Sequence, residues 1–401
     1  METIYSLVYG VVAIILMAVY IIGILYVVIF RIGYTMKRRD EKGSDAIVAT
    51  KERVSVVLPI YNEETRMIRG TIDTLRKQRS ISMDVIIVIK HPLTGQINML
   101  KGYRKYFHSL EIIEQRGKPS HNEAFIIGLR HASAPYSAIL CADAKIKDNS
   151  LSQMVAALKH TKKDVAFGSL YPEVKWTNAG RSTGIAKIVR QDLTLFGRYS
   201  LGLGYFIPGA FAVYRTSFLK NEFKYLTANN FVMHDLGITL RLSRSDPSRA
   251  YFMNKVVGTE LEKATIKGWL MQNTRWFMGT TALFGIYGKI LAGAKLRIRI
   301  GVIGTIILWD ILPFALFAGV FLSIIGAAMG SFTFVYAYIS AYIIITLFVL
   351  SLPDARTYGL GACLYNWILV SIMKSISAFA IVYGFAFAKY NNSKLYVLFK
   401  R

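Results

Sequence analysis

The sequence predicts an α/β domain with a mostly parallel sheet, one transmembrane helix before it and about three after it. The first observation is composition, since 53% of the 401 residues are hydrophobic and the mean hydropathy is +0.38. This is more apolar than an ordinary soluble domain. The second is a set of long uncharged runs on both sides of the central region. The third is that short β-branched runs alternate with helical patterns in that region, which is typical of parallel strands joined by crossover helices.

The first uncharged run, residues 5–30, is long enough to cross a hydrocarbon core of about 30 Å. It has no small-residue cleavage site and no basic residue before it, so we expect a retained anchor and not a secretory signal. Only Glu2 is charged before this run, whereas several Lys and Arg follow it. That bias places the N-terminus outside and residues 31–299 in the cytoplasm.

Three further apolar runs cover residues 300–330, 333–352 and 360–388. At about 1.5 Å per residue the first is too long for one straight span, and it predicts a tilt, a kink at Pro313 or a broken pair. Four spans place the C-terminus outside, but the basic tail favours the inside, so its side stays open. We therefore expect a multi-pass protein of the cell membrane with a cytoplasmic catalytic domain.

These patterns divide the chain into six expected segments. They are an N-terminal transmembrane helix (1–31), a basic linker (32–50), an α/β domain (51–263), an amphipathic interfacial segment (264–296), the later transmembrane helices (297–390) and a basic tail (391–401).

The formal net charge is +25, but the basic residues are scattered and no nucleic-acid module accompanies them. We therefore expect no nucleic acid as a partner. Attraction to anionic lipid headgroups and to phosphorylated substrates explains the charge equally well. Cys141 and Cys363 are far apart in the sequence and predict neither a disulfide framework nor a metal site.

Within the domain, strands and helices alternate. Strands are expected at 54–58, 84–89, 110–114, 136–140 and 164–170, and helices at 63–79, 122–132 and 149–160. Ligands bind at the carboxyl ends of the strands in such sheets. The residues that follow each strand are therefore the candidates for function.

Two strand ends carry candidate residues. After the first strand come Pro59, Tyr61 and Glu63, which suit either a binding turn or simply a proline turn with acids starting a helix. Asp143 follows the strand at 136–140, where a carboxylate can hold Mg²⁺ or Mn²⁺ against a diphosphate. The alternative is that Asp143 only ends the strand or caps the next helix, for which Asp148 also qualifies.

His234 and Asp235 begin an amphipathic helical pattern. A carboxylate near a helix N-terminus tends to stay ionised, as a general base requires. An acidic helix cap is the structural alternative.

Gln272, Arg275 and Trp276 share one face of a later helix. Arg suits bidentate contact with phosphate, and Trp offers a flat surface to a sugar or a lipid head. The alternative is an interfacial helix in which Trp269 and Trp276 belong to an aromatic belt.

Together and in this order, these pieces resemble the membrane-bound family 2 glycosyltransferases of GT-A fold, a group that includes ceramide glucosyltransferase and the cellulose, chitin and hyaluronan synthases. The matching pieces are residues 54–64, 141–143, 234–235 and the Gln-x-x-Arg-Trp pattern at 272–276. The resemblance covers roughly residues 50–285, and its last piece is the most specific.

The resemblance implies an inverting hexosyltransferase that uses a nucleotide-sugar donor with Mg²⁺ or Mn²⁺. Asp235 would be the catalytic base and Asp143 the metal ligand. The donor contacts would be Pro59, Tyr61, Glu63, Lys118, Asp143, Gln272 and Arg275, and the acceptor contacts Gly209, His234 and Trp276.

The chain departs from the family pattern at three positions. Lys90 stands where the family commonly has acids, Cys141 replaces the first Asp of Asp-x-Asp, and His234 replaces the Glu before the base. Lys90 would then contact phosphate or a different nucleotide, or point to solvent. These departures also motivate an alternative, a GT-A membrane protein without catalytic activity.

The acceptor is expected to be a lipid or a lipid-linked glycan, with membrane lipids as further partners. Residues 277–295 contain no gating loop of the polymer synthases, and the spans are few. The amphipathic segment would hold the site at the headgroup level. A processive polysaccharide synthase remains the alternative, favoured by Asp310 and Lys374 within the apolar runs, where ionisable groups are costly.

Overall fold

The computed structural model describes residues 2–38, 52–116, 121–174, 177–228, 234–263, 265–273, 292–330 and 332–350, together with residues 361, 369 and 372. Its centre is a mixed eight-stranded sheet of order β3-β2-β1-β4-β7-β6-β8-β5. The strands are β1 (Arg53–Tyr61), β2 (Ser82–Lys90), β3 (Ser109–Glu114), β4 (Tyr136–Leu140), β5 (Ala144–Ile146), β6 (Val165–Glu173), β7 (Phe211–Arg215) and β8 (Ala250–Leu261). Six strands run in one direction, and only β5 and β7 run against them. The predicted α/β class is confirmed.

The parallel strands are buried on both faces. In β1 seven consecutive residues are buried, and its Val56 pairs in register with Val85 of β2. Continuous β-branched runs suit such positions because helices cover both sides of the sheet. The five strands expected from the sequence all form, whereas β5, β7 and β8 were not predicted.

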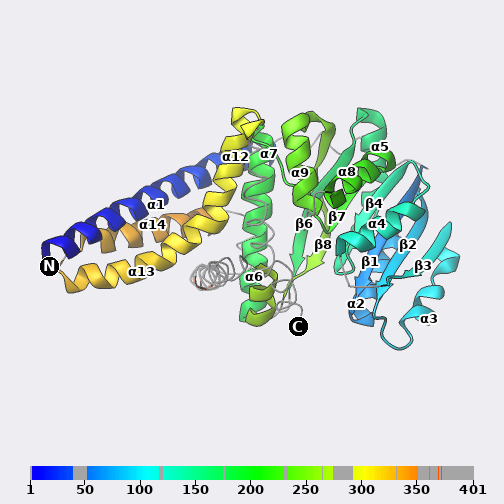
Figure 1. Ribbon diagram of the computed structural model, residues 1–401, viewed down its shortest axis with the longest axis horizontal. Helices are drawn as coiled ribbons and strands as arrows, with labels where there is room; N and C mark the ends of the chain where they lie inside the picture. Colours follow the sequence, from blue (N-terminus) through cyan, green and yellow to red (C-terminus); the bar gives the residue numbers. More distant parts are fainter. Residues whose placement is uncertain are drawn as a thin grey trace.

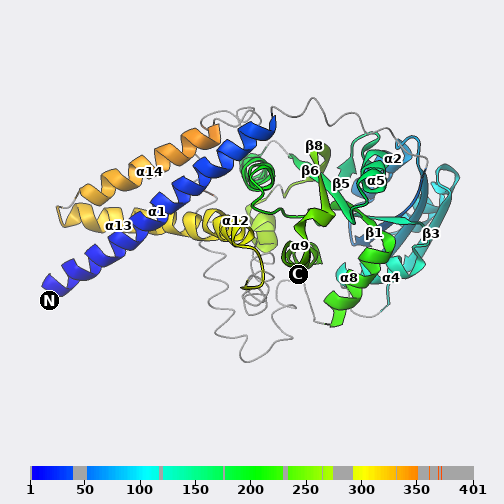
Figure 2. The ribbon, with the colours of Figure 1, turned by 90° about the horizontal axis from the view of Figure 1, so that it is seen from above.

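Helices cover both faces of the sheet. Figure 2 shows α2 (Thr65–Arg76) and α5 (Ser150–Thr161) on one face, with α4 (His121–His131) and α8 (Thr216–Ala228) on the other. The remaining helices of the domain are α3 (Gln96–Lys101), η2 (Arg104–Tyr106), α9 (His234–Ser245) and η4 (Pro247–Arg249). The result is a three-layer domain.

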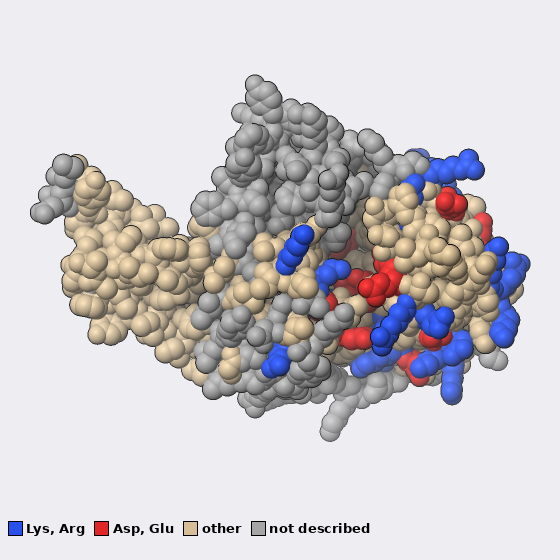
Figure 3. Space-filling model, turned by 90° about the horizontal axis from the view of Figure 1, so that it is seen from below, with Lys and Arg blue, Asp and Glu red and all other residues tan. Residues whose placement is uncertain are grey.

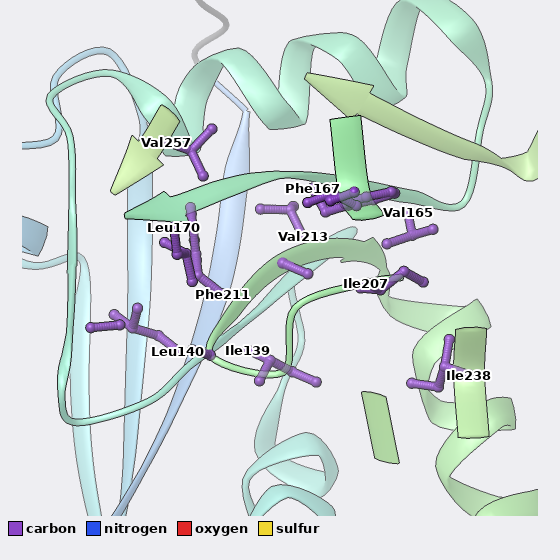
Figure 4. Packing of buried hydrophobic residues seen from close by; sticks show 14 of the residues in the cluster. Ile139, Leu140, Val165, Phe167, Leu170, Ile207, Phe211, Val213, Ile238 and Val257 are labelled. Atoms are coloured by element: carbon purple, nitrogen blue, oxygen red, sulfur yellow. The ribbon is translucent and has the colours of Figure 1, made fainter. Parts of the chain in front are cut away.

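The core under α9 joins the antiparallel part of the sheet to this helix. Figure 4 shows Ile238 of α9 nearest to Ile207, which lies between it and Val165, and Val213 belongs to the same core cluster. All four side chains are fully buried. This packing fixes the start of α9, where Asp235 lies.

A long helix connects the domain with the N-terminal helix. It consists of α6 (Asn178–Val189), the π-helix η3 (Arg190–Gly197) and α7 (Arg198–Ser200). In Figure 1 it stands upright between the domain and a rod of helices. A π-helical turn inside an α-helix is uncommon and often marks a functional site.

The rod contains α1 (Glu2–Arg38), α13 (Leu312–Ala328) and α14 (Thr333–Leu350), and α12 (Leu296–Ile306) with the π-helix η5 (Ile307–Ile311) leads into it (Figure 1). Residues 296–309 and 312–328 meet at a bend of 41°. The bend lies just before Pro313, whose ring removes a helical hydrogen bond. A break is thus found where the sequence predicts a kink or a broken pair.

One described helix, residues 4–36, is long and apolar enough to cross a membrane, and the bent pair passes the same criterion when taken as one span. Residues 333–347 form a shorter apolar helix. Most of the predicted last span, 360–388, lies outside the described residues. The structure therefore supports one apolar spanning helix, and the multi-pass arrangement stays a prediction.

Candidate functional site

Strand direction brings distant residues together at one edge of the sheet. Because β7 runs against β4, Phe211 at the start of β7 pairs with Leu140 at the end of β4. Because β5 runs against β8, Ala144 at the start of β5 pairs with Glu260 near the end of β8. The carboxyl ends of the parallel strands and the starts of the two reversed strands therefore share one edge.

Asp143 lies in the turn between β4 and β5, and its backbone oxygen accepts a hydrogen bond of 2.9 Å from the Leu261 amide. Burial raises the pKa of its carboxyl to about 6, with a further increase from Glu260 that Lys263 and Lys187 oppose. The alternative roles as helix caps do not apply, because α5 begins at Ser150 with Asn149 before it.

Glu63 lies beside this turn and outside any helix. Since α2 begins at Thr65, the interpretation of Glu63 as an acid in the first helical turn is wrong. Its carboxylate instead accepts a hydrogen bond from the Tyr61 amide at the end of β1. Burial raises the pKa of Glu63 to about 7, and the nearby charge of Asp143 adds to the shift. Pro59 is buried within β1, and the Tyr61 side chain is exposed.

Asp235 lies in the first turn of α9, directly against Gly209. A Cβ at Gly209 would be 2.7 Å from Oδ2 of Asp235, so only glycine leaves room for the carboxylate there. The other carboxylate oxygen accepts a 2.8 Å hydrogen bond from the Leu236 amide. Burial raises the pKa of Asp235, while hydrogen bonds from backbone amides and the charge of Arg190 lower it. Asp235, the predicted base, and Gly209, the predicted acceptor-side turn, are therefore in direct contact.

His234 is buried in an aromatic cluster. Its ring stacks on Phe223 with 5.7 Å between ring centroids and meets Phe125 edge-on at 4.8 Å. Burial lowers the pKa of His234 to about 4, so the imidazole is neutral near pH 7. The ring therefore adds no charge beside Asp235.

Cys141 occupies the centre of the site. Its amide donates a 2.8 Å hydrogen bond to Ala210, and its sulfur lies 3.6 Å from the Gly209 oxygen. Burial raises the pKa of the thiol well above its ordinary value, and four carboxylates add to the shift. They are Asp143, Glu260, Asp235 and Glu63. Carboxylates from four separate parts of the chain thus act on one neutral thiol.

The side chains at this edge set limits on a metal ion. A protonated thiol is a poor ligand for a hard cation. Among the residues that the structure describes, no group of three or more His, Cys, Asp or Glu side chains is arranged to hold a metal. Mg²⁺ commonly uses only one or two protein carboxylates and takes its other ligands from substrate phosphates and water. Asp143 suits that arrangement as a single carboxylate ligand.

A buried ion-pair cluster on β8 and α6 supports this edge, and the sequence analysis missed it. Lys187 Nζ lies 2.5 Å from Glu260 and 2.6 Å from Glu262. Burial lowers the pKa of Lys187, but the two carboxylates raise it by more. The only clue in the sequence was the run of charged residues at the end of β8, a strand that pairs with β5 and β6.

Figure 3 shows Asp and Glu side chains gathered in a hollow on the side of the domain that faces the rod.

Lys90 ends β2 and does not point freely into solvent. Its ammonium donates a 3.0 Å hydrogen bond to the Gln115 backbone oxygen, just after β3. The next residue, His91, contacts the Tyr61 ring edge-on with 5.9 Å between centroids. Lys90, which stands where the family commonly has an acid, therefore links the end of β2 to the residue that follows β3.

The Gln-x-x-Arg-Trp segment is described only in part. Residues 266–273 are helical, and Gln272 is half-buried in this helix. Trp269 is 5% exposed and packs near Ala186 of α6, so the helix begins against the domain. Lys118, Arg275 and Trp276 lie outside the described residues.

Comparison with known proteins assigns the central part of the chain. Residues 55–223 match the family model described as glycosyl transferase family 2. This part of the chain is a family 2 glycosyltransferase domain. The protein is accordingly a glycosyltransferase, and the matched range contains Glu63, Cys141, Asp143 and Gly209.

Solved structures agree with this glycosyltransferase fold. The mannosyltransferase PcManGT from Pyrobaculum calidifontis, in complex with GDP-Man and Mn²⁺, shares 15% identity at a TM-score of 0.55, covering 89% of this chain and 99% of that one. TarS of S. aureus shares 14% identity at a TM-score of 0.40, covering 65% of this chain and 43% of TarS. At these identities the likeness to PcManGT shows the fold alone, and TarS adds no argument. No curated protein matches the sequence.

Proposed function

We propose that this glycosyltransferase is a membrane-integrated, inverting hexosyltransferase that transfers a sugar from a nucleotide-sugar to a lipid or lipid-linked acceptor at the cytoplasmic face. The observation that carries the proposal is that Gly209 contacts both Cys141, at the end of β4, and Asp235, at the start of α9. Asp143 would then serve the donor and Asp235 the acceptor at one sheet edge. Inverting transfer needs only one carboxylate at the reacting centre, unlike the paired acids of glycoside hydrolases.

The donor would bind across the ends of β1 and β4. Tyr61 is exposed beside His91 and offers its ring to the nucleotide, and the Glu63 carboxylate is close enough to Asp143 for their charges to interact. PcManGT was solved with GDP-Man and Mn²⁺, which supports a nucleoside-diphosphate sugar and a divalent cation here. Mg²⁺ or Mn²⁺ at Asp143 would offset the charge of the donor diphosphate. Lys118, Gln272 and Arg275 complete the proposed donor contacts by resemblance.

The acceptor would lie against Gly209 and Asp235, with His234 behind them and Trp276 as a further contact. The acceptor hydroxyl attacks the anomeric carbon as its proton passes to the Asp235 carboxylate. The bond from the anomeric carbon to the diphosphate oxygen breaks on the opposite side, and the nucleoside diphosphate leaves with the bonding pair. Because Asp235 is half-buried, its carboxylate is a stronger base than a fully exposed one.

The rod supports placement in a membrane. Its outward side chains are large and apolar, and those that are 60–69% exposed include Ile4, Leu7, Ile14, Ile324, Tyr336 and Leu347. Such a continuous apolar surface on α1, α13 and α14 suits lipid tails. A lipid acceptor would reach the site from the same membrane.

The product of transfer tests this proposal. Membranes containing the protein are washed with alkaline carbonate and incubated with Mn²⁺, a lipid extract and radiolabelled GDP-Man or UDP-GlcNAc. We expect the activity to stay in the membrane pellet and the label to enter the organic phase on a molecule carrying one sugar. A long water-soluble or insoluble polymer would instead establish a processive synthase. Loss of activity into the wash would contradict membrane integration.

A further inference from the structure

Lys263 lies where β8 leads into the helix at 266–273. It comes two residues after Leu261, and the Leu261 amide donates a hydrogen bond to the Asp143 backbone oxygen. The Thr183 hydroxyl donates a 3.4 Å hydrogen bond to the Lys263 backbone oxygen. The side-chain stem runs beside Gly268, where a Cβ would lie 3.8 Å from Lys263 Cδ. Both the backbone and the stem of Lys263 are therefore held next to the Asp143 turn.

Two other lysines near this turn have carboxylate partners. Lys145 Nζ lies 2.6 Å from Glu173, and Lys187 is held by Glu260 and Glu262. Within the described part of the chain, no hydrogen bond or ion pair holds the Lys263 ammonium. A half-buried cation without such a partner costs free energy unless a ligand supplies one.

The charge of Lys263 acts on both carboxylates of the donor side. It lowers the pKa of Asp143 and that of Glu63, against the larger effect of burial on each. Yet neither the Asp143 nor the Glu63 carboxylate forms an ion pair with the Lys263 ammonium within 4.0 Å. The positive charge of Lys263 therefore acts in the region in which the donor phosphates are expected.

We propose that Lys263 is a donor-binding residue whose ammonium contacts the diphosphate of the nucleotide-sugar. This inference rests on the proposed function. As the bond to the anomeric carbon breaks, negative charge grows on the leaving diphosphate, and a fixed cation beside Asp143 stabilises it. Lys263 and the cation at Asp143 would thus bind the same diphosphate from two sides.

Nucleoside-diphosphate binding to the purified full-length chain in detergent tests the inference, with GDP and UDP as probes. Lys263→Met keeps the stem but removes the charge, Lys263→Arg keeps the charge, and Lys267→Met removes an exposed charge four residues along the chain. For the nucleotide that the wild type binds, we expect Lys263→Met to weaken affinity about 10-fold or more. Lys263→Arg should recover most of it, and Lys267→Met should match the wild type.

The pH of the measurement separates direct contact from an indirect effect. If Lys263 acted only by keeping Asp143 ionised, Lys263→Met would regain wild-type affinity at about pH 9, where Asp143 is ionised in both proteins. A deficit that persists at that pH supports direct contact, and full recovery overturns it. Equal binding by wild type and Lys263→Met near pH 7 also overturns it. If the wild type binds neither nucleotide, the proposed donor site itself fails.

Discussion

At the residue scale, the site depends on carboxylates that the fold keeps away from water. The pKa of Asp143 is raised to about 6 and that of Glu63 to about 7, in both cases mainly by burial. Such groups bind protons more tightly in the folded than in the unfolded chain. Their free-energy contribution is therefore favourable at low pH and is lost as the pH rises through the folded pKa.

Asp143→Asn should separate stability from activity. Near pH 8 the wild-type carboxylate is ionised at a free-energy cost, and the amide avoids that cost. We expect the variant to be more stable at that pH by at most about 3 kcal/mol, since one pKa unit corresponds to about 1.4 kcal/mol. The difference should vanish at about pH 3, below the ordinary Asp pKa of 3.8, where the carboxyl is neutral in both the folded and the unfolded chain. Thermal unfolding in detergent at the two pH values measures it.

The activity should respond in the opposite sense. Transfer by the wild type should fall as the pH drops through about 6, because Asp143 then takes up a proton and no longer holds a cation. Asp143→Asn should be nearly inactive at every pH. A variant that is active, or that is less stable than the wild type near pH 8, would contradict the role given to this carboxylate.

At the element scale, the N-terminal helix and the π-helix η3 meet backbone to backbone. A Cβ at Gly33 of α1 would lie 2.2 Å from the Gly197 oxygen, and one at Gly197 would lie 2.0 Å from the Phe30 oxygen. Two glycines thus permit a closeness that any side chain prevents. Since η3 begins at Arg190, whose charge acts on Asp235, the contact connects the rod to the proposed base.

Gly33→Ala should therefore destabilise the protein and reduce transfer, because the added methyl pushes η3 away from α1. We expect a loss of about 1–3 kcal/mol, as for overpacked cores. Gly10→Ala is the matched control in the same helix, since a Cβ there meets nothing within 4 Å. The control should be neutral or slightly stabilising. Equal unfolding temperatures for the two variants would show that the helices do not meet in this way.

Sequence patterns predicted the elements that have a clear local signal and missed those that do not. Strands such as β4, in which all five residues are buried, gave continuous apolar runs. The strand β8 mixes buried and half-buried positions over twelve residues, and η3 buries the polar residues Gln191 and Asp192, so neither has a simple periodicity. Local motifs likewise singled out Asp143 and Asp235 as candidates. Lys187 lies near Asp143 through its ion pairs with Glu260 and Glu262, and Lys263 lies near it through the Leu261–Asp143 hydrogen bond. No local sequence pattern encodes these long-range contacts.

At the scale of the whole molecule, a glycosyltransferase domain is joined to an apolar rod. In both ribbon views the rod projects from the side of the domain where the long helix α6-η3 stands (Figures 1 and 2). The site and the rod are thus connected through one helix. This arrangement suits an enzyme whose soluble donor arrives from one side and whose lipid acceptor arrives from the membrane.

The central claim is that Asp235 takes the acceptor proton during sugar transfer. Its most direct test is the initial rate of transfer from a nucleotide-sugar in membranes with Mn²⁺, for the wild type and for Asp235→Asn. Asp148→Asn, which changes an exposed carboxylate in a turn, is the control. We expect Asp235→Asn to be slower by about 10²–10⁴-fold, the usual contribution of a general base, while the control keeps its rate. A near-wild-type rate for Asp235→Asn would contradict the account.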